Sequence, residues 1–159
     1  MSERARVLAE EFEYAFARLE DTVNGVDEKE YRYRLTEESN SISMILNHIS
    51  RITNLNMMRI ITGDPGYTPD GWLSDYVEHD YGVEKLMKDI DAGKRRIVDC
   101  VAGLSDMELD EVIPMMSGPY QRKVGLFAYV GELFHHRGQI AFIRGSINRL
   151  RESNPSFLK

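Results

Sequence analysis

Apolar residues recur at three- and four-residue steps over four long segments of the chain, and this spacing constrains the fold more than any other feature. The segments run from about residues 3 to 24, 39 to 62, 82 to 104 and 123 to 152. Residues so spaced share one face of an α-helix, and no segment convincingly predicts a sheet. Four amphipathic helices bury their apolar faces by packing together, so the sequence predicts an all-α fold, a four-helix bundle.

The predicted connections between these helices are long. About 14 residues separate the first two segments, and the later connections cover residues 63–81 and 105–121. Connections of this length in a compact domain are often functional, because they can cover one end of a bundle. Gly93 lies inside the third segment, where it predicts either a kink or close packing.

Length, charge and cysteine content narrow the function classes. The chain has 159 residues, and we expect residues 1–159 to form one domain with a core over about residues 3–151. The formal net charge of -6 disfavours nucleic acid and anionic membranes as partners. No apolar run reaches the roughly 18–20 residues that span a bilayer. A charged N-terminal segment without an apolar signal core, together with a single cysteine, favours a cytoplasmic location.

Two of the four histidines lie where a metal site can form. His48 follows Ile45 by three residues and precedes Ile52 by four, so it shares the edge of the apolar face of the second helix. Glu132 and His136 are four residues apart on one face of the last helix, and the apolar residues of that face predict that it points inward. Inward carboxylate and imidazole groups hold metal ions in other bundles. A core histidine satisfied by one hydrogen bond, and an ordinary helical Glu–His pair, explain the same spacings.

The neighbours of His136 are expected to point elsewhere. His135 is rotated by about 100° from His136, which places it at the surface or against a ligand residue rather than against a metal. Arg137 either binds an anion or pairs with a carboxylate, and the many acidic residues of the chain favour the pair. Spacing alone therefore predicts a helical bundle with a candidate metal site and no particular reaction.

Two motifs in these helices resemble the signature of the DinB-like superfamily. One is Leu46-Asn47-His48-Ile49 within the second segment, and the other is His135-His136-Arg137-Gly138-Gln139-Ile140, about 90 residues later. The resemblance covers about residues 3 to 151 in length, helix order and motif position. It implies a four-helix bundle with long connections and a metal site that typically holds nickel or zinc. It also implies transferase or isomerase reactions that use a low-molecular-weight thiol.

The metal ligands of that superfamily are one histidine from the second helix and two from the last, spaced His-x3-His. By this resemblance His48 is the first ligand and His136 the third, while the second falls on Glu132. Glutamate binds zinc, nickel, iron and manganese, so a site of two histidines and one carboxylate is chemically sensible. The carboxylate makes the site harder, which extends the expected divalent metals from nickel or zinc to iron or manganese.

The resemblance implies a divalent-metal-dependent enzyme, a thiol-dependent S-transferase or isomerase or a hydrolytic relative, acting on a small-molecule substrate and forming a homodimer. The alternative is a non-catalytic, stress-associated binding bundle with a vestigial metal site, and Glu132 separates the two: it is a ligand in the first and a bystander in the second. The motifs assign no catalytic residue. Asp75 and His79, in the second long connection, are candidates for an acid, a base or an extra ligand. A loop packed by its aromatic residues, with solvated charges, explains them as well.

Overall fold

The computed structural model describes residues 2–115 and 118–158, and these residues fold mostly into helix, as predicted. The elements in chain order are α1 (Glu3–Val23), α2 (Glu28–Arg32), α3 (Ile42–Arg51), the π-helical turn η1 (Ile52–Asn56), α4 (Met57–Thr62), the 3-10 turn η2 (Tyr76–Glu78), α5 (Val83–Ala102), α6 (Asp106–Asp110), β1 (Val112–Ile113), β2 (Tyr120–Gln121) and α7 (Arg122–Ser153). Within the described ranges no helix is long and apolar enough to cross a bilayer.

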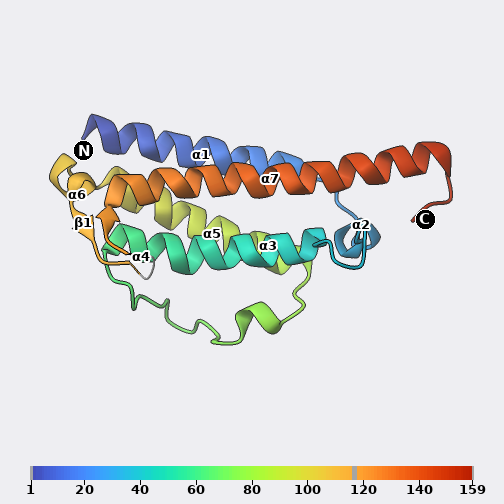
Figure 1. The fold of residues 1–159 in the computed structure, drawn as a ribbon, viewed down its shortest axis with the longest axis horizontal. Helices are drawn as coiled ribbons and strands as arrows, with labels where there is room; N and C mark the ends of the chain where they lie inside the picture. The colour runs from blue at the N-terminus through green and yellow to red at the C-terminus, as the bar shows by residue number, and fades with distance from the viewer. Residues whose placement is uncertain (1, 116–117, 159) are drawn as a thin grey trace.

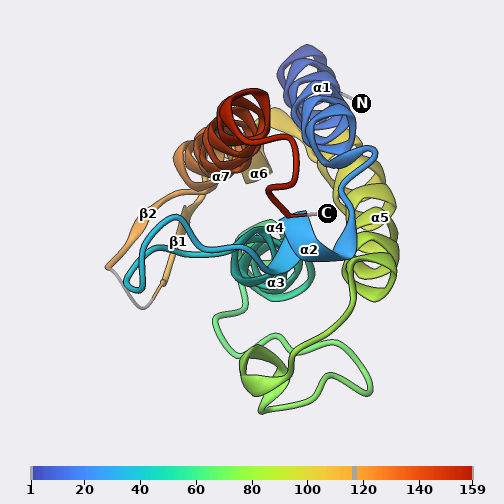
Figure 2. The same ribbon diagram turned by 90° about the vertical axis from the view of Figure 1, so that its right-hand side faces the viewer.

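The long helical segments α1, α3–α4, α5 and α7 lie side by side (Figure 1). α1 packs against α5 and α7, and α3 packs against the same two helices. In the end-on view these segments enclose a common interior (Figure 2). Apolar side chains from all of them fill it, and the fully buried ones include Phe12, Phe16, Leu46, Ile49, Leu86, Ile97, Leu126 and Ile140.

Side chains and glycine set the two ends of the second long segment. α3 begins at Ile42, a few residues later than predicted, because the Ser41 hydroxyl accepts a hydrogen bond from the backbone N–H of Met44 at 3.2 Å and caps the helix. α4 ends where Gly63 adopts a left-handed φ of 73°. The predicted helix therefore has the right end and a start that is slightly too early.

The π-helical turn η1 interrupts this segment and was not predicted. Asn54 stabilises it, since its side-chain amide donates to the backbone carbonyls of Ser50 and Asp89, both at 3.0 Å. Gly93 of α5 packs directly on the turn, where a Cβ atom would lie only 2.4 Å from Cγ2 of Thr53. Of the two alternatives predicted for Gly93, the structure thus shows close packing, and the turn fits because residue 93 has no side chain.

The last connection contains structure where the sequence predicted only a loop. It holds α6 and a two-stranded antiparallel sheet in which Ile113 pairs with Tyr120. Each strand has two residues, too few for a periodic signal. Arg122 secures this end, because its buried guanidinium donates to the backbone carbonyls of Ile60 at 3.1 Å and Glu108 at 2.8 Å.

The connection between α4 and α5 runs along the outside of α3 and α4 (Figure 1). Tyr76 is buried there, and its hydroxyl donates to Asp89 at 2.6 Å while Trp72 stacks on its ring at a centroid distance of 4.2 Å. Asn47 of α3 donates from its side chain to the backbone carbonyl of His79 at 3.0 Å. These contacts hold the connection, and His79 with it, against α3.

Candidate metal centre

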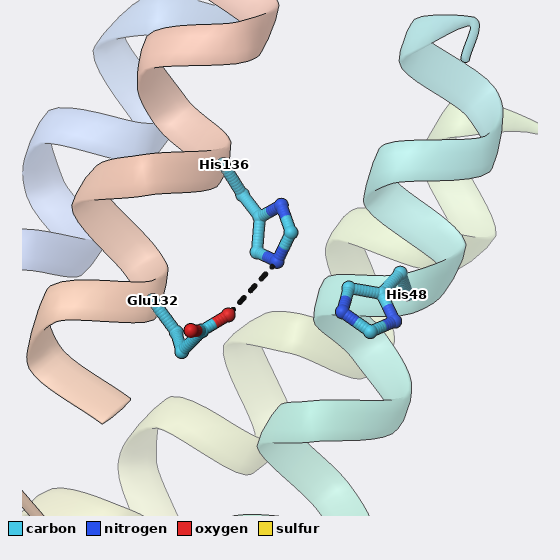
Figure 3. Close-up of side chains that lie close together, drawn as sticks. All are labelled: His48, Glu132 and His136. Carbon is cyan, nitrogen blue, oxygen red and sulfur yellow. Dashed lines mark ion pairs between the residues drawn. The ribbon is translucent and has the colours of Figure 1, made fainter. Parts of the chain in front are cut away.

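His48 on α3 and Glu132 and His136 on α7 converge between the two helices (Figure 3). One ligand atom from each residue lies within 4.8 Å of the other two. The imidazole rings lie edge to face, with centroids 4.7 Å apart and planes at 78°. The three residues selected from the sequence therefore meet at a spacing at which one metal ion can contact all three.

The cluster lies at the edge of the core rather than inside it. His136 has 12% of its side chain exposed, whereas Glu132 has 49% exposed. His48 is half-buried beside the fully or nearly buried Ile45 and Ile49. The prediction that the Glu132 face of α7 points inward is thus wrong at Glu132 itself, because this side of α7 turns toward solvent there. An open side leaves coordination positions that water or a substrate can fill.

A hydrogen bond to Gln139 holds the imidazole of His136. Nδ1 of His136 lies 2.9 Å from Oε1 of Gln139, so the ring carries its proton on Nδ1 and donates it to the amide oxygen. The amide nitrogen of Gln139 lies 3.2 Å from Nε2 of His135 and donates to it in this orientation of the amide. Metal-binding histidines share this arrangement, in which the outer ring N–H is donated and the other nitrogen is free to ligate.

The free nitrogen of His136 supplies a test of whether the residues fit a metal. Nε2 is buried and has no hydrogen-bond partner among the described residues. Oε2 of Glu132 lies 3.3 Å from it without forming a hydrogen bond. A buried lone pair without a partner costs free energy, and a cation that binds both atoms removes that cost. Two imidazoles and one carboxylate are also a known ligand set for divalent first-row metals, so the residues fit.

His48 is electrostatically prepared to act as a neutral ligand. Burial, the His136 ring and the Arg51 guanidinium lower the pKa of His48, while Glu132 opposes them. The imidazole is therefore neutral at neutral pH, which is the form that binds metals. Nη2 of Arg51 lies 3.3 Å from Nδ1 of His48, and an arginine can only donate. A metal at Nε2 requires the ring proton on Nδ1, so binding there has to open this long contact.

A family model for mycothiol-S-transferases matches residues 7–149. The chain belongs to the mycothiol-S-transferase family. This family is part of the DinB/YfiT-like superfamily, so the resemblance carried by the two motifs is confirmed. The matched range contains the whole His48–Glu132–His136 cluster and Gln139. No curated protein matches the chain.

Asp75 and His79 are the two candidates from the α4–α5 connection. In this member of the mycothiol-S-transferase family, only His79 lies at the candidate metal centre. His79 lines one cavity together with His48 and His136, whereas Asp75 does not line it. Nε2 of His79 contacts Oδ2 of Asp75 at 3.0 Å, and both side chains are about half exposed. Neither residue is part of the ligand cluster found within the described residues. Asp75 therefore orients His79 at the rim of the cavity.

Three side chains next to the ligands differ from the sequence-based picture. Arg137 pairs with no carboxylate among the described residues, and its Nε instead donates to the Thr22 hydroxyl at 2.9 Å and ties α7 to α1. Gln139 and Arg51 were missed, although each follows a candidate ligand histidine by three residues and so lies one helical turn away. This three-residue spacing is the sequence signal from which both residues could have been predicted.

Proposed function

We propose that this protein is a divalent-metal-dependent thiol S-transferase whose metal is bound by His48, Glu132 and His136. The observation that carries the proposal is the buried Nε2 of His136, which has no hydrogen-bond partner among the described residues and lies beside a carboxylate and a neutral imidazole. Family membership supports the reaction class, because the matching family is named for transfer of mycothiol. The co-substrate is then mycothiol or a similar low-molecular-weight thiol, and the other substrate is a small molecule.

The protein side chains position and deprotonate the thiol. A bound divalent metal lowers the pKa of a thiol and so supplies a thiolate at neutral pH. Gln139 holds the His136 ring in the ligating tautomer. His79 lines the cavity on which two ligands open, and Asp75 orients it, so we assign it the role of accepting the thiol proton. The two imidazole ligands suit nickel or zinc, and the carboxylate of Glu132 also admits iron or manganese.

Elemental analysis of protein purified without chelators tests this proposal. We expect about one divalent metal per chain, and thiol-transfer activity that disappears with the metal. His136→Ala and Glu132→Ala should each lower the metal content, whereas Glu13→Ala, which removes an exposed carboxylate from α1, should leave it unchanged. Protein that takes up none of the four metals on reconstitution would support the alternative, a non-catalytic bundle with a vestigial site.

We also propose that the whole chain is one domain with the architecture of a four-helix bundle and long connections. The packing of α1, α3, α5 and α7 on one shared core supports this architecture. A reduced thiol as co-substrate and a lone Cys100 suit the cytoplasm, where we place the protein. The net charge of -6 makes nucleic acid and membrane surfaces poor partners.

The expected homodimer has a candidate interface on the outer face of α7. Phe127 and Phe142 are 69% and 64% exposed there, and Gly131 and Gly138 lie between them with open space where a Cβ would point. The two pairs are symmetric about the midpoint between residues 134 and 135. Two antiparallel copies of α7 related by a two-fold axis would therefore place Phe127 against Phe142 and Gly131 against Gly138 at both ends.

Light scattering tests the dimer. We expect Phe142→Glu to shift the protein from dimer to monomer, because it places two charges in a small apolar contact. Met107→Glu is the matched control, since Met107 is 82% exposed on α6, outside this face. Wild-type protein that remains monomeric over the whole accessible concentration range would contradict the interface.

A further inference from the structure

Two cavities of different chemistry meet at the candidate metal centre. The first, of about 510 Å³, is lined by His48 and His136, and we call it the polar cavity. The second, of about 440 Å³, is lined by His48 and Glu132, and we call it the aromatic cavity. His48 lines both, so the two cavities adjoin at the candidate metal centre. A metal held by the three candidate ligands would be reachable from both cavities.

The polar cavity is rich in hydrogen-bond acceptors. Asn47 lines it and is only 7% exposed, yet its Oδ1 has no hydrogen-bond partner among the described residues. The amide nitrogen of Asn47 is already occupied by the backbone carbonyls of Tyr76 and His79, so the amide cannot turn to change what it offers. Asp80 and Gln139 add further side-chain oxygens to the wall, and each oxygen keeps a second lone pair although Asp80 already accepts from Ser43 and Arg32 and Gln139 from His136. Oδ1 itself is covered, so a donor reaches it only through a small shift of the cavity wall, and either a water molecule or a hydroxyl group of a ligand can supply that donor.

The aromatic cavity has the opposite character. Two tyrosine rings, Tyr120 and Tyr129, line it together with aliphatic side chains of α7 and η1, and Glu132 is its one carboxylate. Gly125 allows this arrangement, because a Cβ at that position would lie 2.5 Å from Cε2 of Tyr120. The same tyrosines continue into a smaller hollow of about 190 Å³ that is also lined by Met115. Such walls suit an apolar or aromatic molecule.

We propose that the two substrates of the transfer bind in the two cavities that adjoin at the metal centre, with the hydroxyl-bearing thiol in the polar cavity and an apolar electrophile in the aromatic cavity. This inference rests on the proposed transferase function and deepens it. The thiol sulfur forms a bond to a carbon of the electrophile, and the bond from that carbon to its leaving group breaks. The leaving group keeps the electron pair, and the thiol proton passes to His79. Because the two cavities meet at His48, substrates bound in both would bring the sulfur and the carbon side by side there.

Filling one cavity at a time tests the assignment. Asn40 and Ala128 are exposed residues that line the polar and the aromatic cavity, so a tryptophan at either position fills a cavity without entering the core. Thiol binding is measured on the cobalt(II)-loaded protein from the sulfur-to-cobalt charge-transfer band, with mycothiol as the probe. Acceptor binding is measured as the KM for a chloromethyl-substituted aromatic compound. Met107→Trp, on the exposed surface of α6 and in neither cavity wall, is the control.

We expect Asn40→Trp to raise the Kd for the thiol about tenfold or more while the KM for the acceptor stays within about twofold. Ala128→Trp should raise the KM for the acceptor by a similar factor while the Kd for the thiol stays within about twofold. Met107→Trp should change neither constant. A thiol Kd that Ala128→Trp raises and Asn40→Trp leaves unchanged would overturn the assignment of the cavities while the transferase function stands. Wild-type protein that binds cobalt but shows no thiol band would overturn the transferase function, and the assignment with it.

Discussion

Replacement of Gln139 by leucine tests whether the imidazole of His136 is held ready for a metal. Leucine has nearly the size of glutamine but accepts no hydrogen bond, so the Nδ1–H of His136 loses the acceptor that lies 2.9 Å away in the wild-type protein. The ring can then turn and change tautomer, and Nε2 offers its lone pair for only part of the time. Loss of such an outer partner typically weakens metal binding about 10- to 100-fold.

The structure predicts that the loss of metal affinity in Gln139→Leu lies near the lower end of that 10- to 100-fold range. The lost interaction is a single neutral hydrogen bond, which contributes about 1 kcal/mol, and Gln139 is half-buried, so water can replace part of it. We therefore expect about a tenfold loss of zinc affinity, or about 1.4 kcal/mol, measured on metal-free protein by competition with a chromophoric chelator. Gln139→Glu is the control, because its carboxylate accepts the same proton and should preserve or increase the affinity. If Gln139→Leu binds zinc as tightly as wild type while Glu132→Ala does not, the hydrogen bond has no part in holding the ligand.

Two further predictions concern stability. The pKa of His48 is lowered in the folded protein, chiefly by burial, so below about pH 6.5 the unfolded chain binds a proton that the folded chain does not. Metal-free protein should thus lose stability as the pH falls below about 7.5 and on toward the lowered pKa of His48, and His48→Gln should reduce this loss; equal losses in thermal unfolding would contradict the assignment. Gly93→Ala should lower the free energy of unfolding by about 1–3 kcal/mol through its clash with Thr53, whereas Gly145→Ala, whose Cβ meets only Arg149, should not lower it. Urea unfolding measures both, and a Gly93→Ala protein as stable as wild type would refute the packing argument.

The long helices were predictable because their apolar residues repeat with the helical period, which is a property of each segment alone. The π-helical turn was not, because its causes lie in different segments. Asn54 and Gly93 are far apart in the sequence, and neither suggests a π-turn until α5 is packed on η1. The small sheet was not predicted for another reason, because strands of two residues are too short to show a periodic pattern. Local sequence thus predicts where helices form, while contacts between helices decide where they depart from regularity.

The cluster of His48, Glu132 and His136 was predicted from spacing and resemblance, but the surroundings of its members were not. Helical spacing fixes which residues share a face of α7; it does not fix how far α3 covers that face. α3 covers this face of α7 at His136 but not at Glu132, so the histidine is nearly buried and the glutamate is half exposed. The cavity walls depended on packing even more, because Asn47 and Tyr129 reach the site only through the arrangement of α3, α7 and the connections.

The glutamate at position 132 and the arginine at position 51 have compensating effects at this site. Burial, His136 and Arg51 lower the pKa of His48, and Glu132 raises it. The superfamily pattern has a histidine where this chain has Glu132, and a third imidazole would leave the positive charge of Arg51 without that opposing carboxylate. A carboxylate there also attracts a divalent cation toward a site that carries a guanidinium 3.3 Å from one ligand. Because Glu132 is half exposed, it keeps part of its hydration and its charge is not costly to hold in place. The departure from His-x3-His is therefore consistent with a working site in this chain, in which the half-exposed Glu132 would supply charge and the half-buried His48 would supply a neutral nitrogen.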